Sequence, residues 1–179
     1  MLTTDKALIL IIDIQGNLAN AMYEKDLLFQ NLSKMIRGAQ ALEIPLIVTE
    51  QTPAKLGPTI PEISSLVREF NPVPKTSFSC CREESFMKAL NRVGRPQVAI
   101  AGIESHVCVY QTTVDLVALG YEVNVICDCI SSRTPENRAI GIERMVAEGG
   151  KRSGTEMALF ELMKAAEGNT FRELVKIVK

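Results

Sequence analysis

Short apolar runs that alternate with helix-like stretches are the feature that most limits how this chain can fold. Four runs are rich in Ile, Val and Leu and do not alternate with polar residues: Ala7–Ile12, Pro45–Thr49, Gln97–Ala101 and Glu122–Ile126. Strands that are buried on both faces, as in parallel sheets, have this composition. Six other stretches are expected to be helices: Glu24–Leu42, Arg82–Val93, Ser105–Leu119, Glu136–Glu148, Thr155–Lys164 and Thr170–Val178. The alternation predicts an α/β fold with a mostly parallel sheet.

Size and composition favour one domain that spans residues 1–179. A chain of 179 residues with 46% apolar and 23% charged residues has ordinary globular composition. Its two loop-like segments, Gln51–Pro61 and Asn71–Pro74, are short enough to be connections within a domain. The net charge of −1 and the pI of about 5.9 argue against nucleic acid or an anionic membrane surface as a partner.

The apolar run near the N-terminus, Ala7–Ile12, is too short to span a membrane and has no small-residue cleavage site. We therefore expect a soluble, cytoplasmic protein that has no membrane partner.

The chain has one histidine, His106, and five cysteines. One histidine cannot build a site of several histidine ligands, so we expect no metal and no other cofactor. An odd number of cysteines leaves at least one thiol unpaired, and reduced thiols are the better interpretation for a cytoplasmic chain. The adjacent Cys80 and Cys81 suggest a redox pair as an alternative to packing thiols. The sequence assigns no role to Cys127 or Cys129.

Several common α/β motifs are absent. The first predicted strand is followed by DIQGN, so no dinucleotide-binding glycine pattern stands there. The chain also lacks a phosphate-binding loop, a G-x-S-x-G nucleophile motif and a C-x-x-C dithiol.

Ligand sites of parallel α/β sheets lie at the carboxyl ends of the strands. Asp13 stands at such an end, and it is either a site residue or a loop anchor. Cys108 follows the third strand within the first turn of an expected helix, for which Ser105 is a suitable N-cap. The positive end of the helix dipole would favour a thiolate there. Cys108 is therefore a candidate nucleophile, although a buried packing thiol is an equal alternative.

Three motifs resemble the isochorismatase-like cysteine hydrolases: Asp13-Ile14-Gln15, Lys75 in PVPKTSFS, and GIESHVCV at 102–109. The likeness extends to DCISSR at 128–133 and LFEL at 159–162, and it points to the metal-free branch of the family. It implies a three-layer α/β/α, Rossmann-like fold and a catalytic triad of Asp13, Lys75 and Cys108. It also implies a cis peptide bond at Ile103–Glu104 and an oxyanion hole formed by the N–H groups of Glu104 and Cys108.

One departure from the family pattern disfavours the activity of one of its branches. The nicotinamidase branch carries a histidine-rich metal site between the second strand and the lysine, whereas TEQTPAKLGPTIPEI contains no histidine. The resemblance therefore implies a metal-independent cysteine hydrolase that acts on a small amide or related C–N or ester-type substrate through a thioester, as a homo-oligomer. The alternatives are a non-catalytic α/β binding or scaffold protein and a thiol redox protein. Gln15, Gln51 and His106 either line the substrate pocket or belong to the surface.

Overall fold

Six parallel strands form one sheet in a computed structural model that describes all 179 residues. The strand order is β3-β2-β1-β4-β5-β6, and all strand pairs are parallel. The strands are β1 (Ala7–Ile12), β2 (Leu46–Gln51), β3 (Val73–Lys75), β4 (Gln97–Gly102), β5 (Glu122–Ile130) and β6 (Lys151–Ser153). The predicted α/β class with a mostly parallel sheet is confirmed.

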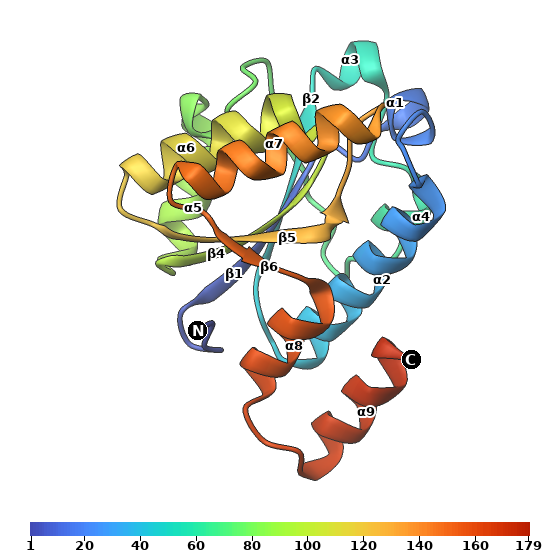
Figure 1. The fold of residues 1–179 in the computed structure, drawn as a ribbon, viewed down its shortest axis with the longest axis vertical. Helices are drawn as coiled ribbons and strands as arrows, with labels where there is room; N and C mark the ends of the chain where they lie inside the picture. Colours follow the sequence, from blue (N-terminus) through green and yellow to red (C-terminus); the bar gives the residue numbers. More distant parts are fainter.

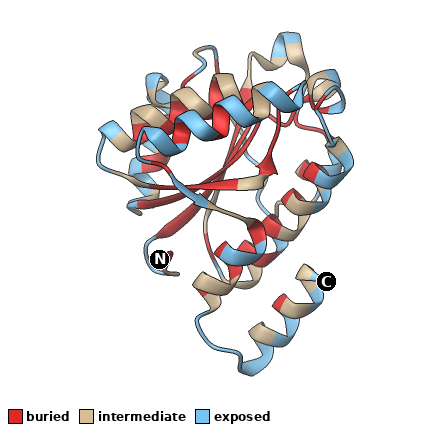
Figure 2. Ribbon diagram, viewed as in Figure 1, coloured by how far each residue is buried: buried red, intermediate tan, exposed pale blue.

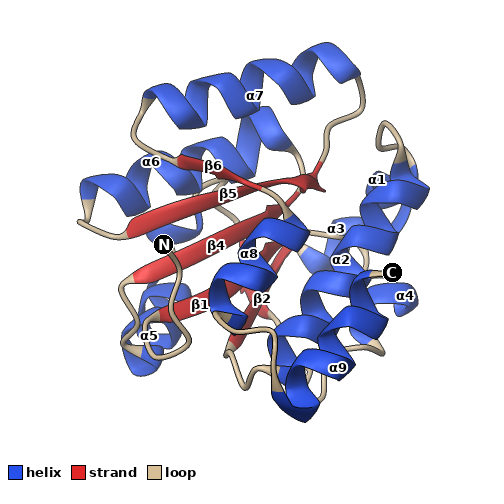
Figure 3. Cartoon of the chain, turned by 60° about the horizontal axis from the view of Figure 1, so that its bottom comes forward, coloured by secondary structure: helices blue, strands red, loops and turns tan.

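Helices cover both faces of the sheet (Figures 1 and 3). They are α1 (Gly16–Asn20), α2 (Lys25–Ala41), α3 (Pro53–Leu56), α4 (Pro61–Ser64), α5 (Glu84–Val93), α6 (Tyr110–Ala118), α7 (Pro135–Ala147), α8 (Thr155–Met163) and α9 (Gly168–Val178). Buried side chains of α5, α6 and α7 share one hydrophobic core, and those of α2, α4, α8 and α9 share the other. No helix is long and apolar enough to cross a bilayer.

Strand β1 lies at the centre and contributes to both cores. Ile9 and Ile11 face the α2 side, whereas Leu10 and Ile12 face the α5 side, as the two-residue period of a strand requires. All six residues of β1 are buried, and the sheet is the most buried layer of the molecule (Figure 2). Burial of an apolar side chain contributes about 1.5–3 kcal/mol. This central strand therefore anchors whatever follows its carboxyl end, which is Asp13.

The predicted elements differ from the observed ones mainly where elements are short. The run predicted at Ala7–Ile12 is confirmed to the residue, while β5 continues to Ile130, four residues beyond the prediction. Strands β3 and β6 were not predicted, because three residues give no periodicity to detect. Pro74 in β3 is tolerated because β3 is an edge strand. The helix expected from Ser105 begins instead as a π-helical turn, Ser105–Val109, and becomes α-helical at Tyr110.

Candidate active site

Three residues of the predicted triad come from three different segments at the carboxyl edge of the sheet. Asp13 directly follows β1, Lys75 is the last residue of β3, and Cys108 lies in the π-helical turn after β4. Register explains how β3 contributes: Lys75 pairs with Gln51, the last residue of β2, and β2 lies beside β1. Strand order thus brings positions that are far apart in sequence to one edge.

Asp13 and Lys75 form a buried ion pair. Lys75 Nζ lies 2.7 Å from Asp13 Oδ2, and the two side chains are 0% and 2% exposed. The other carboxylate oxygen, Oδ1, accepts a hydrogen bond of 2.8 Å from the Thr49 hydroxyl. Buried charges are tolerated only when they are paired and hydrogen-bonded, and this pair satisfies both conditions.

Lys75 Nζ has three further oxygen partners. It donates to Gln51 Oε1 at 2.6 Å and to the carbonyl oxygens of Ser77 and Phe78, each at 3.2 Å. Burial acts to lower the pKa of Lys75, but the charge of Asp13, followed by the thiols of Cys108 and Cys80, outweighs burial and raises the pKa. The side chain is therefore a fixed cation at neutral pH.

Cys108 is buried, with 7% exposure, and the charges of Asp13 and Lys75 both act on the pKa of its thiol. Its pKa is raised to about 12, first by burial and then by the Asp13 carboxylate, against the lowering effect of the Lys75 ammonium. The expectation that this position favours a thiolate in the resting protein is therefore wrong. Loss of solvent and the nearby Asp13 carboxylate both favour the protonated thiol.

Ser105 does not cap the helix as the sequence suggested. Glu104 occupies the N-cap position and makes no side-chain capping bond. The Ser105 hydroxyl donates instead to the carbonyl oxygen of Arg138 at 3.0 Å, which ties the turn to α7. Gly141 makes this approach feasible, because a Cβ there would lie 2.2 Å from Ser105 Oγ.

The peptide bond between Ile103 and Glu104 is cis. The backbone N–H of Glu104 makes no hydrogen bond within the chain, so it is available to a ligand. The Glu104 side chain points to the segment after β5, where its carboxylate accepts from Arg133 Nε at 3.2 Å and from Arg133 N at 3.1 Å.

The three residues expected to line a pocket have defined partners. Gln15 is buried and is held to backbone: its Nε2 donates to Gln51 O at 3.2 Å and Gly57 O at 2.6 Å, and its Oε1 accepts from Gln51 N at 2.6 Å. Gln51 contacts Lys75 directly. His106 Nδ1 lies 3.0 Å from Ser132 Oγ, and the ring is partly exposed. Of the three, Gln51 is in direct contact with the triad lysine.

Sequence reasoning missed two residues that shape the site. Thr49 bonds to Asp13, and its signal was available: a hydroxyl at the end of the apolar run predicted at Pro45–Thr49, within β2. Glu83 bonds to the loop after Lys75, at Thr76 N and Ser77 N, and no sequence pattern marks this contact.

All five cysteines are free thiols. Cys80 is fully buried, and burial raises its pKa to about 11; burial likewise raises the pKa of Cys81 to about 12. Cys127 is partly buried on β5 and Cys129 is fully buried. No group of three or more His, Cys, Asp or Glu side chains is placed to hold a metal ion.

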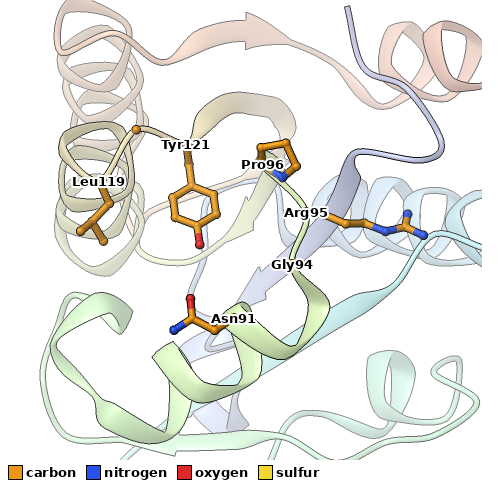
Figure 4. A pocket seen from close by; sticks show the side chains of 7 residues that line it. Asn91, Gly94, Arg95, Pro96, Leu119 and Tyr121 are labelled. Carbon is orange, nitrogen blue, oxygen red and sulfur yellow. The ribbon is translucent and has the colours of Figure 1, made fainter.

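Two pockets frame the sheet at opposite edges. One of about 270 Å³ lies beside Lys75 and is lined by Thr52, Pro74 and Glu83 among others. A second, of about 310 Å³, lies at the amino edge between the ends of α5 and α6, where Asn91, Arg95, Leu119 and Tyr121 line it (Figure 4). The amino-edge pocket contains none of the triad residues.

Fold and site together define a three-layer α/β protein with a carboxylate, an ammonium and a thiol buried at the carboxyl edge of its parallel sheet. The family model of the isochorismatase domain matches residues 7–157. Isochorismatase domain-containing protein 2 of Danio rerio is 33% identical over 178 residues, which cover 99% of this chain and 89% of that protein. The chain belongs to the isochorismatase family, and the resemblance stated from its motifs is confirmed.

Solved structures agree in fold. The MAR1 ribonuclease from Caenorhabditis elegans is 30% identical, with a TM-score of 0.92 and coverage of 99% of this chain and 91% of that chain. The YcaC gene product of Escherichia coli, described as an octameric hydrolase of unknown specificity, has a TM-score of 0.92 at 22% identity, with 98% and 89% coverage. The second likeness concerns the fold alone.

Proposed function

We propose that this chain is a metal-independent cysteine hydrolase that cleaves a small amide, or a related C–N or ester-type bond, through a thioester on Cys108. The observation that carries the proposal is the buried ion pair of 2.7 Å between Lys75 and Asp13, next to a thiol whose pKa depends on both. Such a constellation provides a nucleophile, a base and a fixed cation without histidine.

The first step follows from the protonation states. Because the pKa of Cys108 is about 12, the thiol keeps its proton until a substrate arrives. Asp13 Oδ1 is occupied by Thr49, whereas Oδ2 accepts no well-aligned hydrogen bond from the chain. Oδ2 therefore takes the thiol proton as the sulfur attacks the carbonyl carbon, which is general base catalysis coupled to attack.

The Lys75 ammonium stabilises the negative charge that moves during this step. When the proton moves to Asp13, negative charge moves to the sulfur, and the ammonium stabilises it in either position. The oxyanion of the tetrahedral intermediate is held by the N–H groups of Glu104 and Cys108, in the roles that the family resemblance implies. One such donor is worth about 3–4 kcal/mol in other hydrolases.

Collapse of the intermediate completes the cycle. The C–N bond breaks, the leaving amine takes the proton from Asp13, and the acyl group remains on Cys108 as a thioester. Water then attacks the thioester, gives a proton to Asp13, and the carboxylic acid product leaves as the thiol regains its proton.

The substrate is proposed to be a small molecule. Cys108 is only 7% exposed, so the electrophile must be small enough to enter a closed site. The net charge of −1 provides no overall attraction for a phosphate backbone. Because the relative from C. elegans is named a ribonuclease, single-stranded RNA belongs in the substrate screen as the competing class.

The decisive experiment is a screen of small amides, carbamoyl compounds, esters and single-stranded RNA, run in parallel on wild type, Cys108→Ala and Cys127→Ala. Cys127 is a partly buried free thiol outside the site, so its variant should keep full activity. Loss of the nucleophile should reduce turnover at least about a thousandfold. Hydrolysis that survives in Cys108→Ala would overturn the mechanism.

The two alternatives from the sequence give different results in the same samples. A scaffold protein would turn over no substrate, neither as wild type nor as either variant. A redox protein would lose about two mass units on mild oxidation and would fail to do so in Cys80→Ser. Because Cys80 is fully buried, the redox hypothesis is the weaker of these two alternatives.

We also propose that the chain works as a cytoplasmic homo-oligomer. YcaC is described as octameric, and Ile140 and Val146 on α7 are exposed at 54% and 40%. Sedimentation analysis tests the assembly, and a species of 19.7 kDa at micromolar concentration would contradict it. Cell fractionation tests the compartment.

A further inference from the structure

Glu83 holds a loop rather than the helix that it precedes. It occupies the N-cap position of α5 but makes no capping bond there. Its Oε1 instead accepts from Ser77 N at 2.7 Å, Thr76 N at 2.8 Å and the Thr76 hydroxyl at 3.1 Å. These hydrogen bonds, those from the Ser77 and Thr76 backbone first, lower the pKa of Glu83 to about 2. The carboxylate is therefore ionised at every working pH.

The loop that Glu83 holds is the one that supports Lys75. Residues 76–79 connect β3 to the turn Cys80–Arg82, and the carbonyl oxygens of Ser77 and Phe78 accept hydrogen bonds from Lys75 Nζ. The Phe78 side chain is 53% exposed, so it does not anchor the loop by packing. Glu83 holds the amides of Thr76 and Ser77, and Gln51 Nε2 holds the carbonyl oxygen of Thr76 at 2.7 Å.

We propose that Glu83 is a positioning residue for Lys75: by holding the amides of Thr76 and Ser77, it fixes the two carbonyls that aim the Lys75 ammonium at Asp13. The proposal rests on the triad of the proposed function and assigns it a support outside the buried site. Glu83 itself touches no triad residue.

The expected consequence lies in the reactivity of Cys108. The groups that face its thiol are Asp13 from β1, Lys75 from β3 and Cys80 from the turn that follows the loop. Only Lys75 favours the thiolate, and its ammonium is placed by four oxygens, two of which belong to the loop. Without the hydrogen bonds to Glu83, the two loop carbonyls shift, and the Lys75 ammonium moves relative to its four oxygen partners. The Cys108 thiolate then loses stabilisation by this charge.

The experiment measures the rate at which acrylamide labels Cys108 between pH 6 and pH 10, by peptide mass spectrometry. Glu83→Ala should label about tenfold more slowly at pH 8, which corresponds to a rise of one unit in the thiol pKa, and the whole pH profile should shift to higher pH. The matched control is Glu84→Ala, which removes the next carboxylate along the chain. Glu84 forms an exposed pair with Lys88 at 2.6 Å, and its variant should match wild type.

A conservative variant separates positioning from general destabilisation. Glu83→Gln keeps an acceptor oxygen but loses the charge, so its labelling rate should lie between those of wild type and Glu83→Ala. If Glu83→Ala does not fold, Glu83→Gln compared with Glu84→Gln decides the question. Equal rates for the matched Glu83 and Glu84 variants would overturn the proposal.

Lys75→Met distinguishes the positioning role of Glu83 from the triad itself. Slow labelling in Lys75→Met together with wild-type labelling in Glu83→Ala would reject the positioning role and leave the triad intact. Unchanged labelling in Lys75→Met would reject the triad itself, and the positioning role with it.

Discussion

The two edges of the central sheet have opposite characters. The carboxyl edge holds an ion pair that is 0% and 2% exposed and a thiol that is 7% exposed. The amino edge has an open pocket of about 310 Å³ and an ion pair, Lys151 with Glu122 at 3.0 Å, that is 56% and 31% exposed. A pocket of similar volume, about 270 Å³, lies beside Lys75 at the carboxyl edge, so the two edges differ in the burial of their charged groups rather than in the size of their pockets.

Helix direction adds to this difference. In a parallel α/β sheet the helices begin at the carboxyl edge and end at the amino edge, where their unpaired carbonyl groups carry partial negative charge. α5 ends at Val93 and α6 at Ala118, both beside the amino-edge pocket. The cation in that pocket, Arg95, already donates to the carbonyls of Thr4 and Ala7. This cation is therefore already engaged by backbone carbonyl oxygens.

The largest expected effect comes from replacing the carboxylate of the buried ion pair with an amide, compared with the same change in the exposed pair. Asp13→Asn leaves the Lys75 charge buried without its partner and should cost about 3–5 kcal/mol of unfolding free energy. Glu122→Gln breaks the partly exposed pair at the other edge and should cost less than about 1 kcal/mol. Urea unfolding at pH 7 measures both. Similar losses for the two variants would mean that the edges do not differ in this respect.

Two glycines show that the backbone is more tightly packed at the carboxyl edge than at the amino edge. Gly102 ends β4 with φ +129°, and a Cβ there would lie 2.2 Å from the carbonyl oxygen of Ile12, directly before Asp13. Gly120, at the amino edge, has φ +87° and open space around it. Gly102→Ala should cost about 2–4 kcal/mol, from strain and overlap together, and Gly120→Ala about 1 kcal/mol, from strain alone. Thermal unfolding of the two variants gives the difference, and a larger loss for Gly120→Ala would contradict it.

The same contrast explains how much of the fold the sequence could predict. Long, strongly apolar segments such as Ala7–Ile12 were assigned correctly because burial on both faces leaves a clear composition. Strand β3 was not, because Pro74 and a length of three residues hide it, yet its register places Lys75 beside Gln51. Local sequence patterns predict the central strands of a sheet better than the short strands that border it.

The site divides in a similar way. Asp13 and Cys108 were candidates from strand ends alone, whereas Lys75 entered only through the family resemblance, since a lysine in a loop-like segment is ordinarily solvated. The thiolate expectation failed because the burial of Cys108 and its proximity to Asp13 depend on the whole fold, and both raise the pKa of the thiol. Glu83 was missed because its contacts depend on the conformation of residues 76–79, which no periodicity encodes.

The edges should also lose stability at opposite ends of the pH scale. At the amino edge, burial acts to raise the pKa of Glu122, but the hydrogen bond and charge of Lys151 outweigh it and lower the pKa below 4.5. That contribution is present above pH 4.5 and is lost as the pH falls further. At the carboxyl edge, Cys108 has a pKa of about 12 in the folded chain against 9.0 for an ordinary thiol. The folded chain keeps this proton, so stability is lost as the pH rises above about 9.

The smallest expected effect is the size of that alkaline loss. For one thiol with these two pKa values, the unfolding free energy falls by about 1.4 kcal/mol between pH 8 and pH 10. Cys108→Ala should remove this part of the fall under reducing conditions, while Glu122→Gln should leave the alkaline side unchanged and flatten the acid side. Urea unfolding at pH 3.5, 8 and 10 measures all three chains. An alkaline fall that is the same in Cys108→Ala and wild type would show that the thiol is already ionised in the folded chain, and the coupling of proton transfer to nucleophilic attack would then be wrong.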